Sequence, residues 1–225
     1  MPRLVWDQTG ERVYETGVKH AVLYPYDNTA GKYAKGVAWN GITNITESPS
    51  GAEETPLYAD DIKYLSLRSV EELGLKIEAY TYPDEWAQCD GSAEVAKGIT
   101  IGQQGRASFA LVFETTVGND TQLNDYGKKL HIVYGCTAAP SETSHSTVND
   151  SPEAATFSWE IKTVPISVPG KKPTASITID STKVDKSTYA KIEDKLFGDK
   201  TGDATVLLPA ELITLVGGTT PTTGQ

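Results

Sequence analysis

The stretch RASFALVFETT, residues 106–116, sets the fold class because its polarity alternates along the chain. Phe109, Leu111 and Phe113 lie on one side of an extended chain, and Glu114 falls on the other side. A period of two with one apolar side is typical of a β-strand that packs one face against a core. We therefore expect a half-buried strand here.

Similar alternation recurs along much of the chain. Six further segments have the pattern of strands: residues 37–46, 62–69, 73–82, 129–135, 155–163 and 174–180. Turns rich in Gly, Asn and Asp, such as VGNDTQLNDYG at residues 117–127, connect such segments. The sequence thus predicts a mainly β fold of the sandwich or barrel type.

Helices are expected to be few. PDEWAQCDG, residues 83–91, begins with Pro and two acidic residues, which favours one or two helical turns. Residues 184–198 place Tyr189, Ile192 and Leu196 on one face, which predicts an amphipathic helix. A shorter helix is expected around PAELITLV, residues 209–216.

The composition shows no break that would mark a linker between domains. Residues 1–225 are therefore expected to form a single domain. Within it we expect an N-terminal arm over residues 1–16, a C-terminal strand and helices over residues 170–216, and a flexible tail over residues 217–225.

The charge balance argues against a protein that adheres to nucleic acid. The net charge is −10 and the isoelectric point is near 4.8. Lys and Arg form no stripe, and the nearest approach to one is two pairs, Lys128–Lys129 and Lys171–Lys172. Binding to phosphates needs such a basic surface, so sequence-reading DNA or RNA binding is not expected.

The two cysteines, Cys89 and Cys136, lie far apart in unlike contexts. The first residues hold no apolar core of signal-peptide length, so we expect free thiols in a reducing cytosol rather than a disulfide framework. No run approaches the ~20 apolar residues of a membrane-spanning helix, and no membrane segment is expected.

No residue pattern points to catalysis. His20, His131 and His145 each lack a second His or Cys at metal-ligand spacing, and there is no nucleophile elbow. GITIGQQG, residues 98–105, contains glycines but not the Lys and Ser/Thr of a phosphate loop. We expect no catalytic residue, metal or cofactor and no enzyme, although a hydrolase with an unrecognised carboxylate pair stays open.

One acidic stretch needs a particular explanation. ESPSGAEETPLYADDIKY, residues 47–64, carries five carboxylates against one lysine and is interrupted by Pro and Gly. We expect a long loop over residues 47–61 between two strands. It contains Leu57 and Tyr58, for which a purely solvated loop has little use.

A series of longer motifs carries a resemblance to a known family. They are residues 6–25 (WDQTGERVYETGVKHAVLYP), 36–65, 77–104, 126–142 (YGKKLHIVYGCTAAPSE), 148–166 and 172–184. Together they resemble the major tail protein, or tail tube protein, of long-tailed non-contractile bacteriophages (siphophages). The resemblance covers nearly the whole chain up to about residue 198 and fades beyond it.

The resemblance implies a β-sandwich-like tail tube subunit with a flanking α-helix. Such subunits assemble into hexameric rings, and the rings stack into a hollow tube through which DNA passes without sequence-specific binding. It implies a place in the virion tail after assembly in the host cytoplasm. The implied partners are further copies of the chain, the tape measure protein, the tail terminator and the distal tail protein. A virion-surface module that binds carbohydrate is the alternative.

The resemblance also implies roles for particular residues. The long loop is expected to leave its own subunit and pack on neighbours; a loop that packs on its own subunit is the alternative. The expected interface residues are Trp6 and Tyr14 of the N-terminal arm and Glu47, Pro49, Glu53, Glu54, Leu57, Tyr58, Asp60 and Asp61 of the loop. Because the wall of a DNA passage should repel phosphates, Glu78, Glu114 and Glu160 are candidates for lining it.

Overall fold

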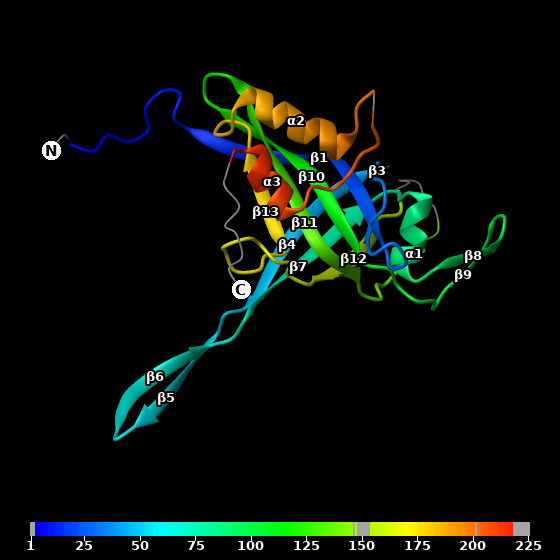
Figure 1. Cartoon of the computed structure of the whole chain (residues 1–225), viewed down its shortest axis with the longest axis horizontal. Coiled ribbons are helices and arrows are strands. Elements are labelled where there is room, and N and C mark those ends of the chain that lie inside the picture. Colours follow the sequence, from blue (N-terminus) through cyan, green and yellow to red (C-terminus); the bar gives the residue numbers. More distant parts are fainter. Residues whose placement is uncertain (1–2, 146, 148–153, 201, 218–225) are drawn as a thin grey trace.

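The computed structural model describes residues 3–145, 147, 154–200 and 202–217 (Figure 1). The chain is mainly β with a few helices, which confirms the predicted fold class. The strands are β1 (Val13–Asp27), β2 (Lys32–Tyr33), β3 (Val37–Trp39), β4 (Ile42–Gly51), β5 (Glu54–Ala59), β6 (Ile62–Arg68), β7 (Glu71–Ala79), β8 (Ala93–Ala96), β9 (Ile99–Ile101), β10 (Phe109–Asn119), β11 (Leu123–Ala138), β12 (Phe157–Thr163) and β13 (Ser176–Asp180). The helices are η1 (Asp84–Trp86), α1 (Ala87–Asp90), α2 (Lys186–Phe197) and α3 (Pro209–Leu215).

The main sheet has nine antiparallel strands and folds into two layers. Its order is β2-β1-β10-β11-β12-β7-β4, with β13 added to β11 and β3 added to β1. Strand β11 joins the layers because its residues 129–133 pair with β13 and its residues 136–138 pair with β12. We call β1, β10, β11 and β13 the first layer, and β12, β7 and β4 the second layer.

The main core fills the space between these two layers. Three tryptophans meet there, with ring centroids 4.6 Å apart for Trp39 and Trp86 and 5.3 Å apart for Trp86 and Trp159. Cys89 and Cys136 are free thiols buried in the same core. Burial raises the pKa of the Cys89 thiol to about 12, so the thiol stays protonated and unreactive at neutral pH.

A second core lies on the opposite face of the first layer, beneath α2 and α3. Tyr189, Ile192 and Leu196 are the buried residues of α2, as their spacing predicts. The hydroxyl of Tyr134 donates a hydrogen bond of 2.6 Å to the Leu207 carbonyl, which ties the segment before α3 to the sheet. The first layer is therefore covered on both faces.

This arrangement corrects the expectation of a half-buried strand at residues 106–116. The first six residues of β10 are all buried, including Ala110 and Val112 on the supposedly outer face. The helices cover that face, and the alternation of residue types carries no information about a second covering layer.

The termini partly follow expectation. The N-terminal arm was expected to reach Thr16, but β1 already begins at Val13 and pairs with β10. The length of β1 was not expected, because two register shifts near Lys19 and a left-handed residue at His20 (φ 52°) interrupt its alternation. Beyond Gly217, the expected flexible tail lies outside the described residues.

The C-terminal strand and helices expected over residues 170–216 are β13, α2 and α3. Helix α2 begins after Asp185, whose carboxylate accepts hydrogen bonds from the backbone N–H groups of Ser187 (3.0 Å) and Thr188 (3.1 Å). Within the described ranges, no helix has the length and hydropathy needed to cross a membrane.

Candidate subunit interface

The most conspicuous feature is a β-ribbon that leaves the body of the protein (Figure 1). Strands β4 and β7 pair from Ile42↔Ala79 in the second layer to Gly51↔Glu71 far outside it. Strands β5 and β6 then continue outward as a separate hairpin. We call residues 52–70 the arm. The expectation of an irregular loop over residues 47–61 is wrong, because most of this segment is strand.

The prolines do not break these strands because the strands are at an edge. Strand β4 forms a ladder with β7 alone among the described elements. Pro49 therefore lies in an edge strand, opposite Leu73, where a missing N–H need not interrupt a central ladder. Pro56 lies opposite Ser66 in the two-stranded hairpin, in which both strands are edges.

A sharp bend, which we call the joint, separates the paired strands β4 and β7 from the arm. Gly51 has φ +83° and Ala52 has φ 53°, so the chain turns sharply after β4. Glu53 and Ser69 close the joint: the Ser69 N–H donates to the Glu53 carbonyl and the Glu53 N–H donates to the Ser69 hydroxyl, both at 3.1 Å. A Cβ at Gly51 would lie 2.2 Å from the Val70 carbonyl oxygen. The joint thus requires glycine.

The arm has one apolar side. The register places five apolar residues on it: Leu57, Ala59, Ile62, Leu65 and Leu67. The side chains of Leu57, Leu65 and Ile62 are 42%, 40% and 65% exposed. An isolated two-stranded ribbon is marginally stable in water, and an exposed apolar face commonly marks an interaction site.

The other side of the arm and its tip are polar. Glu54 and Lys63 form an ion pair of 3.2 Å on that side, where Tyr58 also lies. Asp60 and Asp61 form the tip, with φ 51° and 62°, as a two-residue turn of type I′ requires. Leu57 and Tyr58 therefore point to opposite sides of the arm, and one flat partner surface does not bury both.

The two halves of the N-terminal arm differ in their exposure and in their contacts with the rest of the chain. Trp6 is 70% exposed, and its neighbours Leu4 and Val5 are exposed as well. Tyr14, by contrast, donates a hydrogen bond of 3.0 Å to the side-chain oxygen of Asn124 in its own chain. An interface role for Trp6 and Tyr14 stays a prediction.

The second layer has a bare polar face. Glu78 and Glu160 lie on it together with Lys76, which is directly opposite Glu160 in the ladder. Lys76 and Glu78 form an ion pair of 2.7 Å. Two of the three expected lumen residues thus share one face, but that face carries both signs of charge. Their place at a lumen stays a prediction.

Glu114 does not belong to that face, and its expected place at a lumen is corrected. Its side chain is fully buried on the opposite side of the first layer, next to α2. Lys19 and Lys128 lie 3.3 and 3.5 Å from its carboxylate, and His20 lies 3.6 Å away. Glu114 holds β1, β10 and β11 together and is not available to line a passage.

The charge of Glu114 also affects its neighbour Lys128. Burial alone lowers the pKa of Lys128, but the attraction of Glu114 and of Glu193 in α2 outweighs that effect and leaves the pKa raised. The lysine therefore remains charged next to the buried carboxylate, as a buried acid requires.

A second polar cluster contains His131, Glu15 and Lys129. His131 stacks on Phe113 with ring centroids 4.7 Å apart. Burial lowers the pKa of His131, despite the opposing attraction of Glu15 and of Glu47 at the base of the ribbon.

Within the described ranges, no group of three or more His, Cys, Asp or Glu is placed to hold a metal ion. Of the three histidines, His20 is mostly exposed at the β1 bulge, His131 is 14% exposed and stacks on Phe113, and His145 is exposed in a loop.

Comparisons with known proteins add little. No family model matches the chain, and no curated protein matches its sequence. Among solved structures, one similar chain comes from the cryo-EM structure of the anti-feeding prophage (AFP) baseplate, 6-fold symmetrised. The TM-score is 0.37 at 8% identity, over 80% of this chain and 100% of that chain. A similarity at this level carries no conclusion about function.

Proposed function

We propose that this protein is a structural, non-catalytic subunit of a siphophage tail tube, which assembles into stacked hexameric rings around a DNA passage. The observation that carries the proposal is the arm of residues 52–70. It leaves the body, exposes an apolar side, and has every residue of β5 exposed. The sequence resemblance to tail tube proteins supports the same function and supplies the six-fold symmetry.

The second layer is the sheet best suited to face a passage. The first layer is covered by core on one face and by α2 and α3 on the other. The second layer covers the core with one face and leaves its other face bare, with Glu78 and Glu160 on it. A wall needs such a face. Glu78 and Glu160 balance Lys76 and Lys162 on it, so the face offers phosphates no net positive charge.

The edges of the second layer also suit closure by neighbours. Among the described residues, β4 pairs only with β7. The opposite edge of β12 pairs with β11 at residues 161–163 and has no ladder partner at residues 157–159. Unpaired edges invite association, and a barrel completed by neighbouring copies removes them. We infer that these edges meet between adjacent copies of a ring.

Stacking of the rings is a contact between unlike surfaces, which propagates rather than closes. Such a contact sets no length by itself. The tape measure protein, tail terminator and distal tail protein expected from the resemblance would supply length and ends, and the assembled tube would reside in the virion tail.

Removal of the arm tests the proposal. Residues 52–70 are replaced with Asn-Gly, which joins the paired residues Gly51 and Glu71 by a two-residue hairpin turn. We expect the circular dichroism spectrum to stay β-rich, because the arm contributes nothing to either core. We expect no rings or tubes by negative-stain electron microscopy at concentrations where the parent protein forms them.

The β8–β9 hairpin provides the matched control. Replacement of residues 94–100 with Asn-Gly joins the paired residues Ala93 and Ile101 and removes a second projecting hairpin. This variant should assemble. Normal tubes from the variant without the arm would contradict the role given to the arm.

A further inference from the structure

A cavity of about 490 Å³ lies where β1, the β3–β4 connection and the end of α2 meet. Its apolar walls include Val18, Trp39, Ile42 and Phe197. Ligand pockets usually hold about 300–1,000 Å³, so the cavity has room for a small molecule. It belongs to the body of the protein and plays no part in the role given to the arm.

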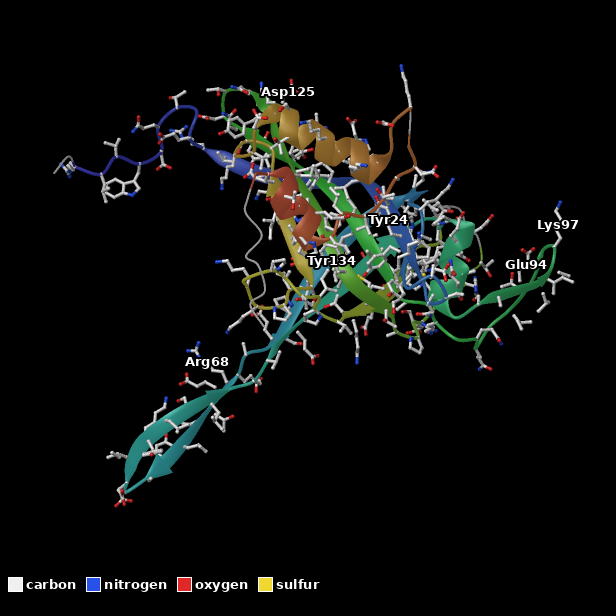
Figure 2. The ribbon with its side chains drawn as sticks, in the orientation of Figure 1. Tyr24, Arg68, Glu94, Lys97, Asp125 and Tyr134 are labelled. Atoms are coloured by element: carbon white, nitrogen blue, oxygen red, sulfur yellow. The ribbon has the colours of Figure 1, made fainter. Side chains whose placement is uncertain are left out.

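Two hydrogen bonds hold the walls of this cavity in place. The indole N–H of Trp39 donates to the Thr81 carbonyl at 2.9 Å, and Trp39 itself belongs to the main core. The hydroxyl of Tyr24, which is labelled in Figure 2, donates to the Leu196 carbonyl. This bond fixes the end of α2 and, with it, the neighbouring Phe197. The cavity is therefore largely formed before a ligand arrives, as small-molecule sites usually are.

An irregularity in β1 brings two basic side chains to the cavity. Between Lys19 and Val22, β1 advances by three residues while its partner β10 advances by two. Consecutive side chains of a regular strand point to opposite faces. Here, however, Lys19 Nζ and His20 Nδ1 lie 3.3 and 3.6 Å from the same oxygen of Glu114, Oε1. The bulge has thus re-aimed one of the two, and both residues line the cavity.

The backbone of His20 is in an unusual conformation at this bulge. Its φ is 52°, in the left-handed region that Gly, Asn and Asp visit most readily. Such a conformation persists only where the surrounding structure holds it, and conformations of this kind gather at ligand sites. The bulge, the two basic side chains and the cavity therefore belong to one local arrangement.

Glu114 does not use up these basic groups. A charge-assisted hydrogen bond is about 2.7–2.9 Å long, and both distances to Glu114 exceed that range. The same carboxylate also has Lys128 at 3.5 Å, and Lys128 has a second partner in Glu193 of α2. The side chains of Lys19 and His20 are 43% and 62% exposed. Their remaining donors are therefore available to a second anion.

The charge of its lining distinguishes this cavity from two grooves next to α3. Among the described residues that line the cavity, Lys19 and His20 are the ionisable ones and none is acidic. By contrast, Asp203 and Glu211 line a groove between β2 and α3, and Asp180 lines a groove between β13 and α3. In a chain with a net charge of −10, a lining with basic groups alone favours an anion.

We propose that this cavity binds a small monocarboxylate with an apolar body. The carboxylate lies against Lys19 and His20, and the apolar body lies against Trp39 and Phe197. The ligand joins β1, the β3–β4 connection and α2, so its binding stabilises the folded subunit by mass action. This site goes beyond the proposed function and depends on neither the arm nor the tube.

An NMR titration of the isotope-labelled chain with sodium hexanoate, at protein concentrations below assembly, tests the proposal. Hexanol and hexylamine are the comparison ligands, because they keep the apolar body and replace the negative charge by none or by a positive one. We expect hexanoate to shift the signals of the Trp39 indole N–H and the Gly41 amide, since both residues line the cavity. It should bind at least about tenfold more tightly than hexanol, because hydrogen bonds to charged groups are worth about that much.

Three variants locate the site. His20→Asn removes the imidazole and keeps a residue type that tolerates the left-handed backbone, so it should weaken hexanoate binding by about tenfold. Ala38→Phe places a bulky group on the cavity wall from an exposed position and should abolish binding. The matched control is Lys97→Gln, which removes an exposed lysine at the outer end of the β8–β9 hairpin (Figure 2) and should bind like the parent. Urea unfolding of each variant checks that it is folded.

Three outcomes would overturn the proposal. They are equal or tighter binding of hexanol or hexylamine, hexanoate shifts that leave Trp39 and Gly41 unmoved, and parent-like binding by both His20→Asn and Ala38→Phe. Each of them would leave the proposed tube untouched, because assembly is measured separately. Hexanoate binding by a chain that never forms tubes would support the cavity and count only against the tube.

Discussion

The apolar side of the arm gives the strongest quantitative prediction. Leu57, Leu65 and Leu67 are 42%, 40% and 56% exposed in the single chain. Full burial of a leucine side chain stabilises by about 1.5–3 kcal/mol. Covering the exposed parts of all three in an interface is therefore worth about 2–4 kcal/mol for each arm.

Replacement of the three leucines with serine removes this contribution. At 1.4 kcal/mol per factor of ten, the critical concentration for assembly should rise by about 30-fold to 1,000-fold. The stability of the free subunit should change little, because the leucines belong to neither core. Sedimentation of assembled protein over a concentration series gives the critical concentration, and urea unfolding gives the stability.

The control variant carries serine at Val95, Ile99 and Ile101 of the β8–β9 hairpin, which are 59%, 57% and 40% exposed. It loses a similar amount of exposed apolar surface outside the arm. We expect a critical concentration within about threefold of the parent's, since surface substitutions outside an interface have small effects of about 0.5 kcal/mol. Equal critical concentrations for the arm variant and the parent would refute the reasoning.

Four further predictions concern the joint, the two charged clusters and the bare face of the second layer. Gly51→Ala strains the joint by about 1–3 kcal/mol and should raise the critical concentration by about fivefold to 140-fold. Gly98→Ala, with φ +77° and open space around it, should not raise it, and equal effects would contradict the joint. Glu114→Lys should destabilise the subunit by about 3–5 kcal/mol in urea unfolding, because it leaves the lysines around a buried site uncompensated. Glu78→Lys, by contrast, should leave the subunit folded and slow DNA ejection from assembled tails. The free energy of unfolding should fall as the pH drops below about 6.5, because the folded pKa of His131 lies below its ordinary 6.5 and the unfolded chain binds the proton first. The slope from this site is at most about 1.4 kcal/mol per pH unit, and a His131→Gln variant with the same slope as the parent would exclude it.

The strand pattern was predictable from sequence, because alternation reports local packing on each strand. The layers were not, since β10 alternates like a strand with one free face and yet lies between two cores. The same limit explains why the burial of Glu114 was not predicted. Its position on a polar-looking face gave no sign of α2, which comes more than seventy residues later and covers that face.

For the arm, the rules that relate Pro and Gly to strand breaks fail for a different reason. Pro49, Gly51 and Pro56 predict interruption of a strand, but edge strands tolerate proline and a joint requires glycine. The alternation in residues 62–69 is a better signal, because it predicts a strand there, although it does not identify the hairpin partner of that strand. Sequence identified the segment with the unusual chemistry, and only the structure gave its shape and its two sides.

The central claim is that copies of this chain complete one another into a tube. Negative-stain electron microscopy of the purified, concentrated protein tests it most directly. The account predicts rings or hollow tubes of uniform diameter. A lasting monodisperse monomer at every concentration, even with a tail initiator present, would contradict it and favour a monomeric surface module.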